Sequence, residues 1–215
     1  MKSLQTYIFE RIKDLPSNVS GIIVFDIDDT LLRVDPDVIH VWKRNPDTGK
    51  EIPLTTAQFA EDPDASDPSK RSLFDYREFR DHVIVYNSII SGTPLIKNLR
   101  IMDDYIEAGY EFCFLTARGC EETIKKALDD FLLHKSDTGA MSKLGTVFNK
   151  TLSHAINDQS KKYPGKSDAE KKANILKMLS KKYDRVVFVD DDNKNVSAAR
   201  NLNLDNLKVI KAWDD

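Results

Sequence analysis

A group of carboxylate and hydroxyl side chains follows an apolar run near the start of the chain. Residues 21–25 (GIIVF) lead directly into Asp26, Asp28, Asp29 and Thr30. An aspartate can attack phosphorus and form a covalent intermediate, which divides one difficult step into two easier ones. A second carboxylate two residues away is suited to protonate the leaving oxygen and then to deprotonate the attacking water. Because a carboxylate repels a phosphate dianion, this chemistry requires a divalent cation, and oxygen ligands suit Mg²⁺.

Two further polar clusters follow apolar runs in the same way. Residues 111–115 lead into Thr116, and residues 185–189 lead into the pair Asp190 and Asp191. In an open parallel sheet, ligands bind at the carboxyl ends of the strands, where the strand order reverses. If these three strands are neighbours, their polar clusters converge on one site.

Apolar runs of strand length alternate with segments of helical periodicity along most of the chain. This alternation predicts an α/β fold with a mostly parallel sheet flanked by helices. The strands that we expect cover residues 21–25, 111–115, 146–148, 185–189 and 207–210. The helices that we expect cover residues 93–108, 121–134, 167–181 and 195–201.

Two regions interrupt the alternation. Residues 38–54 are typical of two short strands around a Pro-Asp-Thr-Gly turn, and the polar stretch 61–70 that follows predicts an exposed loop. The second region, residues 135–166, is polar and carries only a weak helical pattern over 152–157. A further amphipathic helix is expected over residues 1–15.

The length and composition narrow the class of protein. At 215 residues the chain fits one domain with a small insertion, and 40% hydrophobic and 31% charged residues are ordinary for a soluble protein. A net charge of -3 argues against a protein whose main task is non-specific binding of nucleic acid, since such domains are usually basic. No apolar run approaches the roughly 20 residues that span a bilayer, and no signal peptide is visible. We expect a cytoplasmic protein without a membrane partner.

The order of these motifs resembles that of the haloacid dehalogenase-like (HAD) superfamily, chiefly its phosphatase branch. That family carries Asp-x-Asp-x-Thr after the first strand, a Thr or Ser after the second, and an acidic pair after the last. The matching positions are Asp26, Asp28, Thr30, Thr116, Asp190 and Asp191. The resemblance extends from about residue 21 to residue 210 and implies a Rossmann-like, HAD-type sheet. The sequence is also similar to phage-encoded members and to polynucleotide 3'-phosphatase domains.

The resemblance implies a catalytic role for several of these residues. Asp26 would be the nucleophile, Asp28 the acid and base, and Thr116 a donor to the phosphoryl oxygens. The presence of Asp28 separates a phosphatase from a dehalogenase, which lacks that acid and base. Thr30 is expected to bind substrate, and so is Arg118, for which a plain surface position is the alternative.

The resemblance also implies a magnesium ion as cofactor. Asp26 and Asp190 would be its ligands, together with the backbone carbonyl of Asp28. Asp191 would orient a water bound to the metal.

The family's third motif is a lysine on the helix before the last motif, and three lysines compete for it. On a helix that begins near residue 168, the apolar stripe contains Ala169, Ala173, Leu176 and Leu179. Lys172 falls inside this stripe, where a lysine without a role would be costly. Lys171 lies at the edge of the stripe. We therefore prefer Lys172, with Lys166, just before the helix, as the alternative and as a candidate for substrate binding.

The sequence thus predicts a phosphomonoester hydrolase formed by one domain over 1–215, with a small hairpin and loop insertion over 33–92 as its cap. So short a cap would leave the site partly open to a nucleotide, a nucleic-acid end or a phosphoprotein. Trp42, Lys43 and Arg44 on the hairpin could stack on a base and meet a phosphate. The alternatives are a phosphotransferase of the same fold and a non-catalytic module that binds phosphate or nucleic-acid ends.

Overall fold

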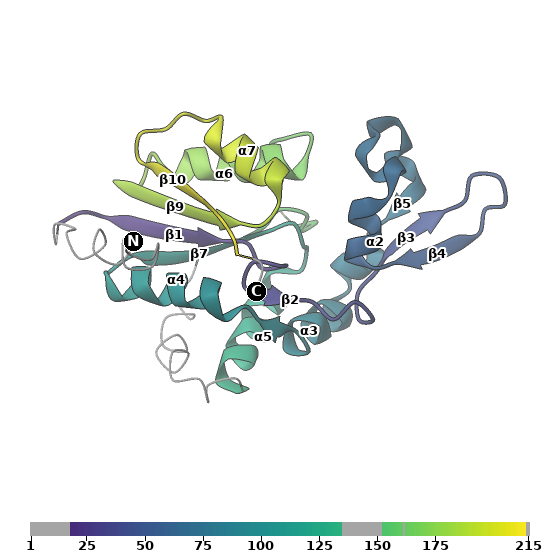
Figure 1. Cartoon of the computed structure of the whole chain (residues 1–215), viewed down its shortest axis with the longest axis horizontal. Coiled ribbons are helices and arrows are strands. Elements are labelled where there is room, and N and C mark those ends of the chain that lie inside the picture. The colour runs from purple at the N-terminus through teal and green to yellow at the C-terminus, as the bar shows by residue number, and fades with distance from the viewer. Residues whose placement is uncertain (1–17, 135–151, 161, 214–215) are drawn as a thin grey trace, which may run out of the picture.

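A computed structural model describes residues 18–134, 152–160 and 162–213 (Figure 1). Its main sheet has five parallel strands in the order β10-β9-β1-β7-β8. The strands are β1 (Gly21–Phe25), β7 (Glu111–Thr116), β8 (Leu152–Ala155), β9 (Arg185–Asp190) and β10 (Leu207–Lys211). The predicted α/β architecture is confirmed, and its three main strands are neighbours, with β1 between β7 and β9.

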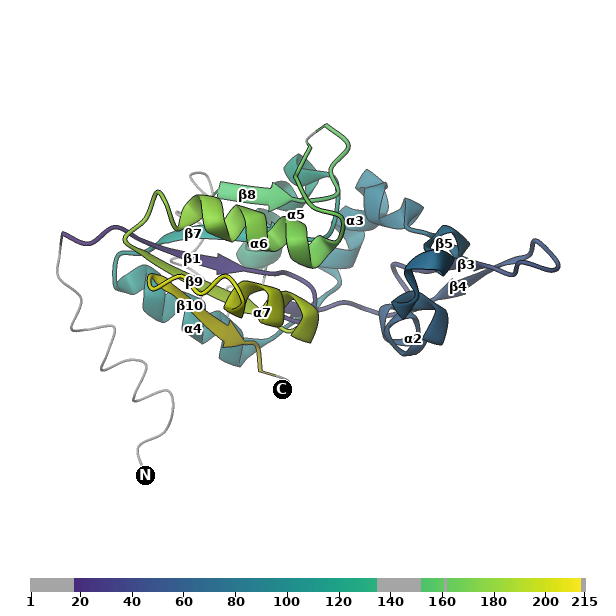
Figure 2. The same cartoon turned by 90° about the horizontal axis from the view of Figure 1, so that it is seen from above.

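Helices cover both faces of this sheet (Figures 1 and 2). One face carries α3 (His82–Ile90), α4 (Ile96–Glu107) and α5 (Glu121–His134). The other face carries α6 (Asp168–Leu179) and α7 (Asn193–Arg200). The Ser167 side chain caps α6 by accepting from the backbone N–H of Glu170. None of the described helices is long and apolar enough to cross a membrane.

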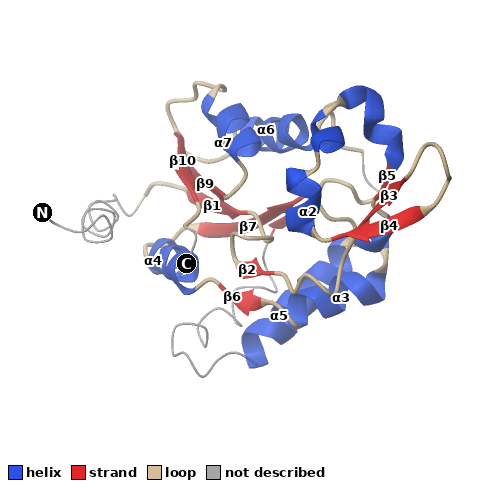
Figure 3. Cartoon of the chain, turned by 45° about the vertical axis from the view of Figure 1, so that its right-hand side comes forward, coloured by secondary structure: helices blue, strands red, loops and turns tan. Residues whose placement is uncertain are grey.

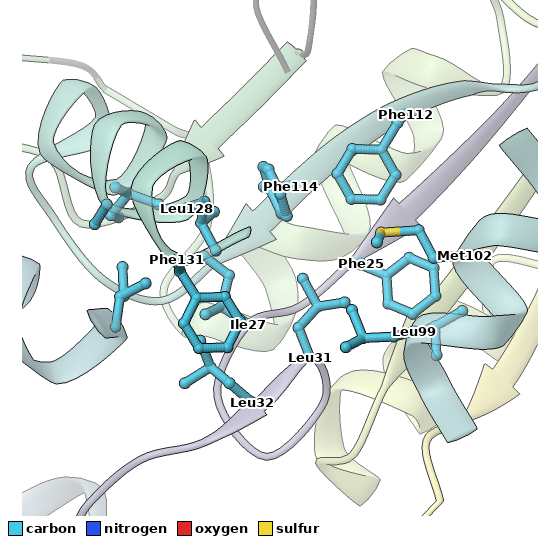
Figure 4. Close-up of a cluster of buried hydrophobic side chains, with 14 of the residues drawn as sticks. Phe25, Ile27, Leu31, Leu32, Leu99, Met102, Phe112, Phe114, Leu128 and Phe131 are labelled. Atoms are coloured by element: carbon cyan, nitrogen blue, oxygen red, sulfur yellow. The ribbon is translucent and has the colours of Figure 1, made fainter. Parts of the chain in front are cut away.

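Side chains of β1 alternate between two hydrophobic clusters, one on each face of the sheet. Ile23 and Phe25 belong to the cluster under α3, α4 and α5, whereas Ile22 and Val24 belong to the cluster under α6 and α7. The first cluster is rich in aromatic rings, and Phe25 stacks on Phe112 with 5.9 Å between ring centroids (Figure 4). A strand buried on both faces requires an unbroken apolar run, which is why this element was predictable.

A smaller body lies between β2 (Leu32–Arg33) and β6 (Thr93–Pro94), two strands that pair antiparallel. Its three-stranded sheet has the order β4-β3-β5, formed by β4 (Glu51–Leu54), β3 (Val41–Arg44) and β5 (Phe74–Asp75). The short helix α2 (Thr56–Glu61) and 3₁₀ turns at Pro63–Ser66, Pro68–Leu73 and Arg77–Arg80 complete it. This body stands beyond the carboxyl ends of the main strands (Figures 1 and 3).

The predicted hairpin is confirmed, but the exposed loop expected over 61–70 is wrong. This stretch forms the end of α2 and two 3₁₀ turns, each of which begins with an Asp-Pro pair. The Asp62 and Asp67 side chains accept from the backbone N–H groups of Asp64 and Ser69. Aspartate and proline therefore build ordered turns here, since the carboxylate satisfies a free N–H and proline fixes the first helical φ angle.

One expected helix begins later, another is a strand, and two further expected elements fall outside the described residues. Thr93 and Pro94 form β6 instead of opening a helix, and α4 begins at Ile96. The weak helix expected over 152–157 is wrong, because residues 152–155 pair with β7 as a fifth parallel strand. The strand expected over 146–148 and the helix over 1–15 lie outside the described residues.

Candidate active site

The end of β1 places Asp26 and Asp28 at the carboxyl edge of the sheet. Asp26 still belongs to the ladder, because its N–H donates to the Val189 carbonyl of β9 at 3.0 Å. The chain then turns tightly around the Ile27 carbonyl, which accepts from three successive backbone N–H groups. Asp29 has a φ of 51°, a conformation that aspartate tolerates better than most residues. The turn therefore places the two carboxylates on one short loop.

The three polar clusters meet at this edge, as their positions after the strands predict. Thr116 ends β7 and Asp190 ends β9, the two strands that flank β1. The chain order reverses at β1, which is the place where open α/β sheets bind ligands. Asp26, Thr116 and Asp190 are all buried.

Lys172 bridges two of these carboxylates. Its ammonium lies 2.9 Å from Asp26 Oδ1 and 2.8 Å from Asp190 Oδ2, and its side chain is 2% exposed. Burial alone would lower the pKa of Lys172, but the negative charges of Asp190 and Asp26 outweigh burial and raise it. Lys172 is therefore a charged group held between the ends of β1 and β9.

The two competing lysines lie elsewhere. The Lys171 ammonium donates to Asn157 Oδ1 at 2.5 Å and lies 3.6 Å from Asp168. Lys166 is exposed, and its backbone carbonyl accepts from Arg71 of the smaller body at 3.0 Å. Among the three, Lys172 is the one that the structure places between Asp26 and Asp190.

Asp26, Asp190 and Asp191 form a cluster that could hold a metal ion. Each offers a carboxylate oxygen, and these oxygens all lie within 4.8 Å of one another. Asp26 Oδ1 is buried and accepts no well-aligned hydrogen bond from the described residues, although the Lys172 ammonium lies beside it. The residues therefore fit a cation that prefers oxygen ligands. The Asp28 side chain is not in this cluster.

Burial dominates the electrostatics of the cluster. It raises the pKa of Asp26 well above the ordinary range, which Lys172 opposes and Asp190 reinforces. Burial and the neighbouring Asp190 raise the pKa of Asp191 to about 7. Both shifts arise chiefly from burial, and the neighbouring carboxylates add to them.

Asp190 is oriented by residues that sequence reasoning missed. Its Oδ1 accepts from the backbone N–H of Asp192 at 2.9 Å, and both of its oxygens lie 3.1 Å from the Asn195 amide. Asn195 is buried in the first turn of α7. The signal that could have revealed it is its position five residues after Asp190, where a helix that begins at the strand end turns back toward the site.

Thr30 orients Asp191. Its hydroxyl donates to Asp191 Oδ1 at 3.0 Å and accepts from the Asp191 backbone N–H at 3.1 Å. Thr30 is fully buried. The structure thus places the Thr30 hydroxyl on a carboxylate of the cluster, and its expected contact with substrate stays a prediction.

Arg118 holds Asp28. Its Nε lies 2.9 Å from Asp28 Oδ2, and its Nη2 lies 2.5 Å from Asp28 Oδ1. Its Nη1 donates to the Ser88 hydroxyl at 2.6 Å and to the Val85 carbonyl at 3.4 Å. Arg118 is fully buried, so the alternative of a plain surface position is wrong. Its backbone N–H also donates to Thr116 Oγ1 at 3.2 Å.

The hairpin residues suggested for contact with a base serve the smaller body itself. Trp42 Nε1 donates to Glu78 Oε1 at 2.7 Å, and the Arg77 guanidinium lies 4.5 Å from the centroid of the Trp42 ring. The Lys43 ammonium pairs with Asp62, which caps the first 3₁₀ turn, and with Asp64 within that turn. Trp42 and Lys43 are thus occupied by internal contacts, whereas Arg44 is exposed.

Comparisons with known proteins place the chain in a family. A family model described as haloacid dehalogenase-like hydrolase matches residues 21–203. A solved structure described as that of the Pnkp1/Rnl/Hen1 complex is 16% identical with a TM-score of 0.46, too distant to carry an argument. That likeness covers 94% of this chain, which spans 50% of the other chain's length. A comparison with curated proteins found no match. Because the family model includes every site residue described above, the chain belongs to the haloacid dehalogenase-like hydrolases.

Proposed function

We propose that the chain is a magnesium-dependent phosphomonoester hydrolase that acts through a phosphorylated Asp26. The observation that supports it most is the charge balance of the buried cluster. Asp26, Asp190 and Asp191 bring three carboxylates together, and Lys172 supplies one ammonium. Two negative charges remain when all are ionised, which a divalent cation would neutralise.

In the first step, Asp26 attacks phosphorus in line with the leaving oxygen. A bond forms between the Asp26 carboxylate and phosphorus, and the ester bond from phosphorus to oxygen breaks. Asp28 gives its proton to the departing oxygen. Lys172 holds Asp26 in place and offsets the negative charge that the phosphoryl group brings. The Thr116 hydroxyl donates to the oxygens of the phosphoryl group.

In the second step, water attacks the phosphorus of phosphorylated Asp26. Asp28 takes a proton from this water, and the bond from Asp26 to phosphorus breaks to release phosphate. The Asp28 side chain is 27% exposed, so it can reach both the leaving group and water while Arg118 holds it.

A magnesium ion would be held by Asp26 and Asp190, with Asp191 and the backbone carbonyl of Asp28 nearby, and would supply positive charge that the attack on a phosphate dianion needs. Asn195 fixes Asp190 for this purpose, and Thr30 does the same for Asp191. Asn195 belongs to α7 and Thr30 to the loop after β1, so two separate elements orient the proposed ligands Asp190 and Asp191.

We propose that the insertion over 33–92 acts as a small cap over this site. It stands on the side to which the main strands point, and Arg71 reaches across to the Lys166 carbonyl (Figure 1). Lys166 and Arg71 are exposed cations near one another, suited to a phosphorylated substrate such as a nucleotide, a nucleic-acid end or a phosphoprotein. The presence of Asp26, Asp28 and Asp190 favours an enzyme over a binding module.

Release of phosphate from nitrophenyl phosphate tests this proposal. We expect hydrolysis with Mg²⁺, its loss with EDTA, and its recovery when excess Mg²⁺ is restored. Asp26→Asn and Asp28→Asn should each reduce turnover by at least about a hundredfold, since each removes a reacting group. Asp47→Asn, in the exposed hairpin turn, is the matched control and should retain activity. Full hydrolysis by either Asp26→Asn or Asp28→Asn would contradict the mechanism.

A further inference from the structure

The guanidinium of Arg118 contacts both the loop after β1, which carries Asp28, and helix α3 of the insertion. Two of its nitrogens donate to the Asp28 carboxylate, and the third, Nη1, donates to the Ser88 hydroxyl and the Val85 carbonyl of α3. A guanidinium is planar and rigid, so its contacts on α3 fix the direction in which it presents its other nitrogens. The orientation of Asp28 therefore depends on a helix that carries no residue of the expected motifs.

The Ser88 hydroxyl is arranged to receive Arg118. Ser88 is fully buried, and its Oγ donates to the Val85 carbonyl at 2.9 Å. A serine within a helix commonly makes such a bond to the preceding turn. With its proton committed there, the hydroxyl oxygen is left as an acceptor, and Arg118 Nη1 lies 2.6 Å from it.

Helix α3 is a firm support for this contact. Val85 and Ile89 are fully buried in the main hydrophobic core, although they belong to the segment between β2 and β6. Tyr86 donates to Asp130 of α5 at 2.7 Å, which ties the two helices together. The position of Ser88 is therefore set by the packing of the core.

We propose that Ser88 is a positioning residue for hydrolysis, which orients Arg118 so that Arg118 holds Asp28 toward the leaving oxygen. The inference rests on the proposed function, because Asp28 acts as an acid only if the chain transfers phosphoryl groups. Loss of the hydroxyl leaves Nη1 with a single, longer contact at the Val85 carbonyl and frees the guanidinium to turn. A displacement of about 1 Å at a reacting group can cost about a hundredfold in rate.

The effect of Ser88 should depend on the leaving group. An ester with a poor leaving group needs a proton from Asp28, whereas nitrophenyl phosphate expels a stabilised anion. We expect Ser88→Ala to lower kcat/KM about tenfold for phenyl phosphate and less than about threefold for nitrophenyl phosphate. The quantity to measure is kcat/KM, because it reports the step in which the leaving group departs.

Ser153→Ala is the matched control. Ser153 is a buried serine of β8, and its hydroxyl has no hydrogen-bond partner among the described residues. It should leave both kcat/KM values unchanged. If Ser88→Ala fails to fold, the isosteric variants Ser88→Thr and Ser88→Val take its place. Ser88→Thr keeps the hydroxyl and should keep the wild-type dependence of kcat/KM on the leaving group.

A double-mutant cycle completes the test. In the Asp28→Asn background, Ser88→Ala should have no further effect, because Ser88 acts through Asp28. An equal loss for both esters, or an undiminished effect of Ser88→Ala beside Asp28→Asn, would overturn the role of Ser88. A wild-type protein that releases no phosphate would instead contradict the proposed function itself.

Discussion

At the scale of single residues, the site is built on a buried ammonium between two carboxylates. Lys172 lies within 3 Å of both Asp26 and Asp190, and all three side chains are largely removed from water. Desolvation of such groups is expensive, so a pair of this kind adds little net stability compared with apolar residues. Removal of one partner is costly, however, because it leaves the other charges buried without compensation. We therefore expect Lys172 to matter for stability and, under the proposed function, for turnover.

Replacement of Lys172 by methionine tests both effects. We expect Lys172→Met to lower the free energy of unfolding by about 3 kcal/mol without metal, because Asp26 and Asp190 lose their counter-charge. Added Mg²⁺ should recover part of this loss, and turnover should fall by at least about a hundredfold. Urea unfolding and phosphate release measure the two quantities.

Lys177→Met is the control for this change. Lys177 is exposed in the last turn of the same helix and should tolerate methionine with little loss of stability. Equal stability of Lys172→Met and Lys177→Met without metal would show that the buried carboxylates do not need the ammonium.

Residues of the site differ in how far the sequence alone could predict them. Asp26, Thr116 and Asp190 follow apolar strands directly, and Lys172 interrupts an apolar stripe, so their positions could be predicted from local pattern. The contact between Arg118 and Ser88 could not, because it joins α3 to the loop after β7 across 30 residues of chain. Only tertiary packing brings such partners together.

At the scale of elements, strand β1 organises the site because it is the middle strand of the sheet. Its neighbours bring Thr116 and Asp190 to either side of Asp26. The strand-forming tendency of 152–155 was hidden, because its sequence LSHA has little apolar character and its pairing with β7 decides its conformation. The central strands could be predicted from their apolar runs. The edge strand β8 could not, because its conformation depends on pairing with β7.

The start of β1 offers a test of this packing. A methyl group on Gly21 would meet the Tyr110 ring at 2.5 Å. Since Tyr110 is buried in the main core, Gly21→Ala should lower the free energy of unfolding by about 1–3 kcal/mol through overpacking. Thermal unfolding of Gly21→Ala measures the loss.

The matched variant removes the ring. If the clash with Tyr110 causes the loss, Gly21→Ala should cost less in a Tyr110→Leu background than in the wild type. The same cost in both backgrounds would show that the ring is not the obstacle.

At the scale of the whole molecule, the insertion is joined to the main domain at several points. Its last helix, α3, packs on α5, and the Phe79 carbonyl accepts from the Gly119 backbone N–H at 3.0 Å. Arg71 contacts the Lys166 carbonyl just before α6. A cap anchored in this way would leave the floor of the site fixed, while its small sheet lies beyond the strand ends (Figure 3). Substrate size would then be decided by the insertion and chemistry by the main domain.

The most direct measurement is to trap the covalent intermediate on Asp26. Asp28→Asn should slow the second step by removing the base that activates water. After a rapid acid quench of this variant with nitrophenyl phosphate and Mg²⁺, mass spectrometry should find one added phosphoryl group on the peptide that contains Asp26. The additional change Asp26→Asn should abolish the adduct. Hydrolysis without a phosphorylated Asp26, or a phosphoryl group on another residue, would contradict the mechanism.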